Sequence, residues 1–314
     1  MIIDILIYII CKMNIIKKNY IAILIIVFIT FGVTAQNEKG SIEKGTVKVE
    51  KVKKKKKVKL PEIDLSNWKV TIPEGEGKGG AISVEPPEIL NYGTNETLKP
   101  YMYNDSTKGA LTFYAYPTSA TTANTKYSRS ELREQMVPGN DNVNWTFSQG
   151  GNLKAKLSVD EVSRDENGKY HKIIILQIHG RLTNEQKELI GQKDNNAPPV
   201  LKIYWQNGKI RVKTKKLKFS GVNALGILHE EAWTDDEGFN FTEEVGFGKF
   251  QIEIKVTDGK MVVVLNNSEY AVYDDANMKR WGIFENYFKA GNYFQSRDEG
   301  SFAKVSFYEL VVEH

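Results

Sequence analysis

The sequence predicts an all-β fold, a jelly-roll sandwich of two curved antiparallel sheets with a concave substrate groove. Three observations lead to this prediction. From Leu60 onward, the chain consists of short apolar or alternating runs separated by turn residues. Helical periodicity is clear only near residues 183–190, and neither βαβ alternation nor an internal repeat is visible. In three segments, polar residues recur at every second position, which indicates strands with one polar face.

Most of the predicted strands end at a proline, a glycine or a two-residue turn. The runs at residues 68–72 and 110–116 each end at a proline, and the run at 172–179 ends at a glycine. Asn207-Gly208 and Asp258-Gly259 favour tight turns, so the strands around them are predicted to form hairpins. The hairpin strands and the last strand are expected at residues 200–206, 209–215, 250–256, 261–265 and 302–312.

The first sixty residues differ in character from the rest. Residues 1–35 are expected to be a signal peptide, with Met13 as an alternative start and a small-residue cleavage site at residues 33–35. Its apolar run of about 14 residues is shorter than the roughly 20 that span a bilayer, so no stable membrane span is expected after cleavage. An uncleaved anchor stays open as the alternative. Residues 36–60 are Lys-rich and are predicted to be a disordered linker before one domain at residues 61–314.

The charge of the chain is unevenly distributed. The net charge is +4, but residues 1–60 hold 13 of the 43 basic and four of the 39 acidic residues, which leaves −5 for residues 61–314. A global nucleic-acid-binding surface is therefore excluded. The only cysteine, Cys11, lies in the segment expected to be removed, so no disulfide is predicted. The mature protein is expected to be a monomer that is secreted, periplasmic or held at the cell surface.

Three distant segments carry the candidate functional residues. Side chains two residues apart share one face of a strand. The three predicted faces carry Arg129, Glu131, Arg133 and Gln135; Gln177 and His179; and Tyr287, Lys289, Tyr293 and Gln295. Ile173 and Ile175 are expected on the same face as His179, so that this strand emerges from the core into a cleft. If the three faces adjoin, they form a groove suited to binding a sugar carboxylate and moving a proton beside it.

Each segment also has a purely structural interpretation. Residues 129–135 can form a solvent-exposed face, His179 can be a structural histidine, and the aromatic residues of 287–295 can simply pack. Two arginines that flank a glutamate nevertheless favour guanidinium groups fixed by an internal ion pair. A glycine within a strand, Gly291, indicates close approach of a ligand or another backbone. No comparable partners are visible for the other histidines, which are His171, His229 and His314, and no spacing resembles a zinc site.

The three segments resemble the signature motifs of the family 7 polysaccharide lyases, the alginate lyases. The matching motifs are Arg129-Ser-Glu-Leu-Arg-Glu, Gln177-Ile-His179 and Tyr287-Phe-Lys-Ala-Gly-Asn-Tyr293-Phe-Gln295. Residues 65–73 also resemble the start of that family's domain, so the resemblance covers roughly residues 60–314. Asn292 and Phe294 depart from it, because the family more usually has valine and asparagine there. We expect altered packing or altered sugar contacts at these two positions.

The resemblance implies a jelly roll that binds an acidic polysaccharide, alginate, and cleaves it by β-elimination to leave unsaturated uronate ends. By similarity, Arg129, Gln177 and His179 contact or neutralise the carboxylate of the reacting sugar. Tyr293 protonates the departing oxygen, and either His179 or Tyr293 takes the C5 proton. Glu131, Arg133, Lys289 and Gln295 form the substrate-binding set, with Glu131 orienting the arginines. No metal or other cofactor is required, and the isoleucine between Gln177 and His179 implies a preference for guluronate-containing stretches.

Two other functions remain open at this point. A glycoside hydrolase on a similar sandwich would need two carboxylates facing one bond. The acidic stretch at residues 230–244 supplies carboxylates, but we expect it to be a loop over the groove or solvated surface. A non-catalytic carbohydrate-binding module would keep the arginines but would not need the His179 and Tyr293 pair. Elimination leaves a double bond that absorbs ultraviolet light, whereas neither hydrolysis nor binding creates such a bond.

Overall fold

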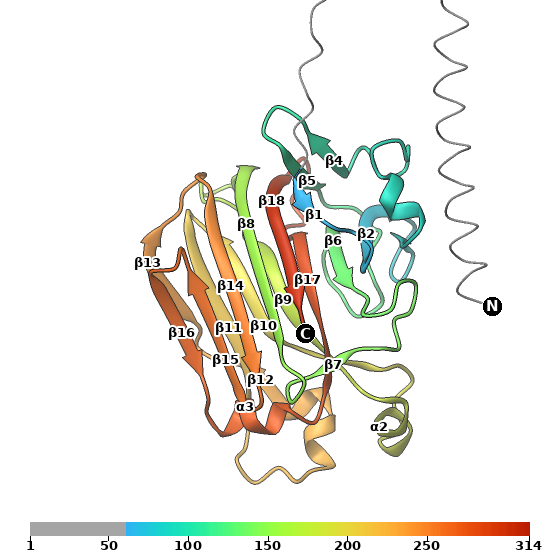
Figure 1. The fold of residues 1–314 in the computed structure, drawn as a ribbon, viewed down its shortest axis with the longest axis vertical. Coiled ribbons are helices and arrows are strands. Elements are labelled where there is room, and N and C mark those ends of the chain that lie inside the picture. Colours follow the sequence, from blue (N-terminus) through green and yellow to red (C-terminus); the bar gives the residue numbers. More distant parts are fainter. Residues whose placement is uncertain (1–60) are drawn as a thin grey trace, which may run out of the picture. The chain divides into compact units, whose positions relative to one another are not determined.

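The computed structural model describes residues 61–314, which form a jelly-roll sandwich of two β-sheets (Figure 1). The predicted fold class is therefore confirmed. The predicted signal peptide and linker lie outside the described residues. All strand pairs are antiparallel in this part of the chain except β1 with β18, which is parallel. No helix among the described residues is long and apolar enough to cross a membrane.

The first sheet, here called sheet A, has the strand order β16-β15-β14-β8-β18-β5-β4, with β1 paired to β18. In Figure 1, β14, β8 and β18 of this sheet form one layer of the sandwich. Its strands are β1 (Glu62–Ile63), β4 (Met102–Asp105), β5 (Ala110–Ala115), β8 (Gly151–Val162), β14 (Phe250–Thr257), β15 (Lys260–Leu265), β16 (Glu269–Tyr273) and β18 (Ala303–Glu313).

The second sheet, sheet B, has the order β12-β11-β10-β9-β17-β6-β2-β3, with β13 paired to β11 and β7 to β17. Its strands are β2 (Trp68–Gly75), β3 (Ala81–Val84), β6 (Arg129–Glu134), β7 (Trp145–Thr146), β9 (Ile173–Arg181), β10 (Asn196–Gln206), β11 (Lys209–Leu217), β12 (Trp233–Asp235), β13 (Phe239–Glu244) and β17 (Glu285–Phe294). The helices are α2 (Asn184–Leu189) and α3 (Ala276–Trp281), with short 3-10 turns η1 (Glu88–Asn91), η2 (Gly226–Leu228) and η3 (Glu230–Ala232).

Alternation along β17 shows how the sheets bury a core and leave one polar face. Phe288, Ala290 and Phe294 are fully buried in the apolar core between the sheets. Tyr287, Lys289 and Tyr293 point to the other side of sheet B, where they contact Arg133, Glu131 and Arg129. The strand thus has one face in the core and one face available for function, as its period of two predicts.

The turn and helix signals are also confirmed. Asn207 and Gly208 both have positive φ angles, 50° and 81°, and join β10 to β11 as a hairpin. The second predicted hairpin joins β14 to β15. Helix α2 begins after Thr183, whose hydroxyl accepts from the Gln186 amide while the Gln186 side chain accepts from the Thr183 amide. This reciprocal cap satisfies two backbone donors that the first turn leaves free.

Three sequence predictions, two about strands and one about a histidine, differ from the structure. Strand β2 continues through Pro73 to Gly75 rather than ending at the proline. The acidic stretch does not form a loop throughout, because β12 and β13 pair with β11 as strands of sheet B. Glu230, Glu231, Glu237 and Glu244 are exposed, which agrees with the alternative of solvated surface. His314 does have a partner, since its Nε2 lies 2.6 Å from Glu134 Oε1.

The predicted face of β9 is wrong at one end. Ile173 and Ile175 belong to the core cluster, whereas Ile174 does not. The register of β9 shifts at this point against both neighbours, β10 and β17, so that Ile174 lies opposite Tyr204 and Tyr293. A β-bulge reverses the faces beyond it, because one extra residue changes the side to which each later side chain points.

The two residues that depart from the family motif lie in the core. Asn292 is fully buried, and its Nδ2 donates to the carbonyl oxygens of Phe113 at 3.2 Å and Ala303 at 2.8 Å. Phe113 and Ala303 belong to sheet A, so this amide connects the two sheets. Phe294 is fully buried and packs edge-on against His171. Both departures therefore change packing and not sugar contacts.

Candidate active site

The three polar faces adjoin, because β9, β17 and β6 are neighbours in sheet B. Lys289 lies directly opposite Arg133 on one side and Gln177 on the other. Tyr293 lies opposite Arg129, and Tyr287 lies opposite His179. The predicted residues of the three strands thus converge on one face of the sheet, which we call the groove face.

Glu131 is the centre of a buried network on this face. Its Oε2 lies 2.7 Å from Arg129 Nη1 and 2.5 Å from Lys289 Nζ, and its Oε1 accepts from Gln177 Nε2 at 2.6 Å. Burial alone would raise the pKa of Glu131, but Lys289 and Arg129 outweigh it and lower that pKa. The carboxylate is therefore ionised and holds a cation, a guanidinium and an amide in fixed positions.

Arg129 retains unused hydrogen-bonding capacity. Its Cζ lies 3.8 Å from the centre of the Tyr293 ring, so the guanidinium stacks on the phenol. Its Nε and Nη2 are buried and have no hydrogen-bond partner among the described residues. Buried donors without a partner are unfavourable, and these two are suited to binding an anion.

His179 is held as a neutral imidazole. Its Nδ1 lies 3.0 Å from the Gly180 carbonyl oxygen, and since a carbonyl only accepts, Nδ1 carries the proton. Nε2 is then an unprotonated acceptor. Burial, followed by repulsion from Lys289, lowers the pKa of His179 to about 3. The half-buried ring stacks on Tyr287, with ring centres 5.2 Å apart and planes 11° from parallel.

Tyr293 is a protonated phenol at neutral pH. Burial raises its pKa above 10, although Arg129 acts in the opposite direction. Burial thus outweighs the effect of the neighbouring guanidinium on the pKa of Tyr293. Tyr127 packs against the Tyr293 ring at 6.3 Å between ring centres. The sequence prediction missed Tyr127, although it lies two residues before Arg129 and continues the same alternation.

Arg133 and Gln135 extend the network toward a loop that the sequence prediction did not identify. Arg133 lies 4.1 Å above the Tyr287 ring, and its Nη1 lies 3.0 Å from Asp141 Oδ1. Gln135 follows the last residue of β6, and its Nε2 donates to Asp141 Oδ1 at 2.9 Å. Asp141 also pairs with Lys69 of β2. Gln135 is buried and fixes this loop, whereas Arg133 and Lys69 line the groove beside it.

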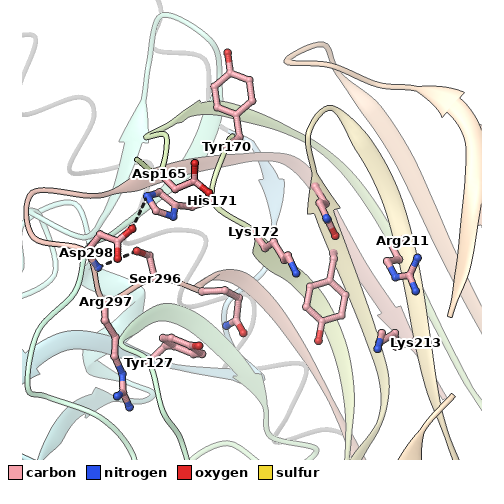
Figure 2. Close-up of a pocket in the computed structure, with 13 residues that line it drawn as sticks. Tyr127, Asp165, Tyr170, His171, Lys172, Arg211, Lys213, Ser296, Arg297 and Asp298 are labelled. Carbon is pink, nitrogen blue, oxygen red and sulfur yellow. Dashed lines mark hydrogen bonds and ion pairs between the residues drawn. The ribbon is translucent and has the colours of Figure 1, made fainter. Parts of the chain in front are cut away.

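Two cavities lie along the groove face. The first, of about 430 Å³, is lined by Arg129, His179, Tyr287 and Lys289 among others. Two further lining residues come from different loops, and the exposed Asn124 donates to Asp194 at 3.2 Å. The second, of about 570 Å³, contains Gln295 and is shown in Figure 2.

The second cavity is also rich in cations and phenols. Arg211 and Lys213 lie on one side of it, and Tyr127 and Arg297 lie on the other (Figure 2). Tyr293 lies between the two cavities along β17, because Tyr287 and Lys289 line the first and Gln295 lines the second. Among residues 61–314, no group of three or more His, Cys, Asp or Glu side chains is arranged to hold a metal ion.

A β-sandwich with fixed cations, an amide, an imidazole and a phenol along an elongated groove defines a protein that acts on an acidic polysaccharide. The comparisons with known proteins identify the family. The model of the alginate lyase family matches residues 63–314, and the chain therefore belongs to the alginate lyase family and is an enzyme.

Individual relatives agree with this assignment. An alginate lyase of Klebsiella pneumoniae is 25% identical over 296 residues, which is 80% of this chain and 90% of that protein. A crystal structure of the family 7 alginate lyase A1-II′ with a bound substrate is 30% identical, with a TM-score of 0.63, and the match covers 80% of this chain and 94% of that one. An alginate lyase of Pseudomonas aeruginosa, 21% identical with a TM-score of 0.59, shares the fold over 80% of this chain and 100% of its own.

Proposed function

We propose that this alginate lyase cleaves its polymer by β-elimination at the groove face, with Arg129, Gln177, His179 and Tyr293 as catalytic residues. The observation that carries the proposal is the Glu131 network. It fixes Arg129, Lys289 and Gln177 beside a neutral imidazole and a protonated phenol. These are the groups that elimination from a uronate requires.

The first task is to neutralise the carboxylate of the reacting sugar. Removal of the C5 proton places negative charge next to that carboxylate, so a carboxylate with unopposed charge resists the step. The unpaired Nε and Nη2 of Arg129 would donate to it. Gln177 would use the donor and acceptor capacity that its bond to Glu131 leaves free.

The second task is to move two protons. Nε2 of His179 takes the C5 proton, the C4–oxygen bond breaks, and a C4–C5 double bond forms. The departing oxygen takes the phenol proton of Tyr293. Tyr293 holds its proton at neutral pH and can therefore serve as the acid, and the unprotonated Nε2 of His179 can accept the C5 proton. The two groups then exchange the proton through solvent, which restores the enzyme.

The remaining residues bind the polymer on either side of the reacting sugar. Arg133 and Lys289 would contact sugars in the first cavity, and Gln295 would contact one in the second. Glu131 has a fully buried side chain, so it would act by positioning its three partners and not by contacting sugar. No cofactor takes part in the proposed steps.

Three finer features belong to the same proposal. The resemblance of Gln177-Ile-His179 to the family motif supports a preference for guluronate-containing stretches. Ile178 itself is fully buried in the core, so its influence would be exerted through packing. The signal-like sequence at residues 13–35 supports export to the periplasm, cell surface or medium. We further propose that residues 61–314 act as one monomeric domain behind the Lys-rich linker.

The test is digestion of guluronate-rich and mannuronate-rich polymers in parallel, with ultraviolet absorbance and new reducing ends both measured. We expect absorbance to rise in step with reducing ends, and to rise faster on the guluronate-rich polymer. Reducing ends without absorbance would indicate hydrolysis and would contradict the elimination. Equal or reversed rates would contradict only the guluronate preference.

A further inference from the structure

Three side chains from three strands form a continuous stack on the groove face. Arg133 of β6 lies 4.1 Å above the ring of Tyr287 on β17, and the other neighbour of that ring is His179 of β9. Tyr287 and His179 are direct cross-strand partners, and their rings are nearly parallel at 11°. The phenol ring is therefore sandwiched between a guanidinium and the imidazole.

The far end of this stack is rigidly held. Arg133 Nη1 donates to the Glu134 carbonyl oxygen at 2.7 Å, and Nη2 donates to the Asp141 carbonyl oxygen and to Asn144 Oδ1, both at 3.0 Å. The Arg133 side chain is buried. A guanidinium fixed by three hydrogen bonds presents a flat, immobile surface on which the Tyr287 ring rests.

The imidazole has few other restraints. Among residues 61–314, the hydrogen bond from Nδ1 to the Gly180 carbonyl is the only one that the His179 side chain makes. This hydrogen bond fixes the tautomer, but it holds the ring at one atom only and so restrains rotation about the Cβ–Cγ bond weakly. The parallel contact with Tyr287 removes that freedom, because rotation would lose the stacking or collide with the ring.

We propose that Tyr287 is a positioning residue, which fixes the plane of the His179 imidazole so that Nε2 faces the C5 proton. Its aromatic ring does this, and its hydroxyl is not needed. The ring face also attracts the imidazolium that forms when His179 takes the proton. The inference rests on the proposed role of His179 as the proton acceptor.

The test compares Tyr287→Phe, which keeps the ring, with Tyr287→Leu, which removes it at a similar volume. We expect kcat of the Leu variant to fall on the order of 10- to 100-fold with KM nearly unchanged, because misplacing a reacting group affects the chemical step. The Phe variant should keep kcat within roughly threefold of wild type. Thermal unfolding is measured for both, and Tyr287→Met replaces the Leu variant if that variant does not fold.

A double-mutant comparison separates this inference from the proposed function. In a His179→Ala background, Tyr287→Leu should cause no further loss of kcat, since no imidazole is left to position. Full activity of His179→Ala would overturn the proposed function itself. Three results would each overturn the role of Tyr287. They are a normal kcat in the Leu variant, an equal loss of kcat in the Phe variant, and an additive loss of kcat in the double variant.

Discussion

Glu131 explains how a cluster of cations can be stable on the groove face. Arg129 and Lys289 lie on adjacent strands, and their charges repel unless an anion separates them. Glu131 is that anion, and it contacts both at 2.7 Å or less. The alternation of Arg129, Glu131 and Arg133 predicted an internal ion pair, and the structure contains it. Lys289 and Gln177 as further partners of Glu131 were not predicted, because they come from other strands.

The charge of Lys289 is predicted to control substrate binding near pH 8. Burial, together with repulsion from Arg129, lowers the pKa of Lys289 to about 8. Lys289 is thus charged below pH 8 and loses its proton above it, so attraction for sugar carboxylates weakens as the pH rises. Between pH 7 and pH 9, KM of the wild type should increase by roughly tenfold, which follows from titration of one group in the free enzyme.

Two variants provide the controls for this pH dependence. Lys289→Arg stays charged throughout the range, so its KM should change little between pH 7 and pH 9. Lys289→Met lacks the charge, so its KM should be high at both pH values. Steady-state kinetics on soluble alginate measure all three proteins. The same rise of KM in wild type and Lys289→Arg would show that a different group titrates.

At the scale of elements, β17 connects the groove with the core. Its groove face carries Tyr287, Lys289 and Tyr293, and Gly291 between Lys289 and Tyr293 has a φ of +142°. A Cβ at Gly291 would lie 2.7 Å from the carbonyl oxygen of Ser130, so only glycine allows β6 to approach this closely. The sequence predicted a close approach at this glycine, and it is the backbone of β6 that approaches.

The back of β17 is held by a buried ion pair. Glu134 Oε2 accepts from the backbone amide of Phe288 at 2.8 Å and from Trp145 Nε1 at 3.0 Å. Its Oε1 lies 2.6 Å from Nε2 of His314, whose Nδ1 donates to the Gly150 carbonyl oxygen at 3.1 Å. Both partners of the imidazole are acceptors, so both of its nitrogens carry protons and the ring is charged.

This pair predicts a pH-dependent contribution to stability. Burial alone would lower the pKa of His314, but the hydrogen bond and charge of Glu134 raise it above 6.5. The contribution is therefore complete below pH 6.5 and is lost as the pH rises through the raised value. At pH 5.5, His314→Gln should lower the free energy of unfolding by about 1 to 3 kcal/mol. Denaturant unfolding at pH 5.5 and pH 9 should show this difference shrink, and a difference that grows with pH would contradict the charged pair.

Periodicity predicts faces correctly only where strands are regular. In β6 and β17 the register continues without a shift between Lys289 and Tyr293, and the predicted residues within these two strands lie on the groove face. Gln135, one residue beyond β6, instead holds the Asp141 loop. In β9 a bulge near Ile175 reverses the face, which no local signal in an isoleucine run indicates. Strand β8 was not predicted, although apolar and polar residues alternate along most of it.

At the scale of the whole molecule, charge is local and not global. The described part of the chain carries a net charge of −5 and nevertheless collects Arg129, Arg133, Lys289, Arg211 and Lys213 along one groove. The sequence predicted the sandwich and the convergence of three strands, because alternation and turn residues are local signals. It did not predict the loop residues around the groove, such as Asp141 and Asn124, since their positions depend on contacts far apart in the chain.

The central claim is that His179 and Tyr293 carry out the elimination on this scaffold. The most direct measurement compares the initial rate of ultraviolet absorbance on alginate for wild type, His179→Ala and Tyr293→Phe, with binding of the polymer measured for each. The account predicts a loss of kcat on the order of 100-fold or more in each variant, with binding retained, since each removes a proton-transfer group. Wild-type rates in both variants would contradict it.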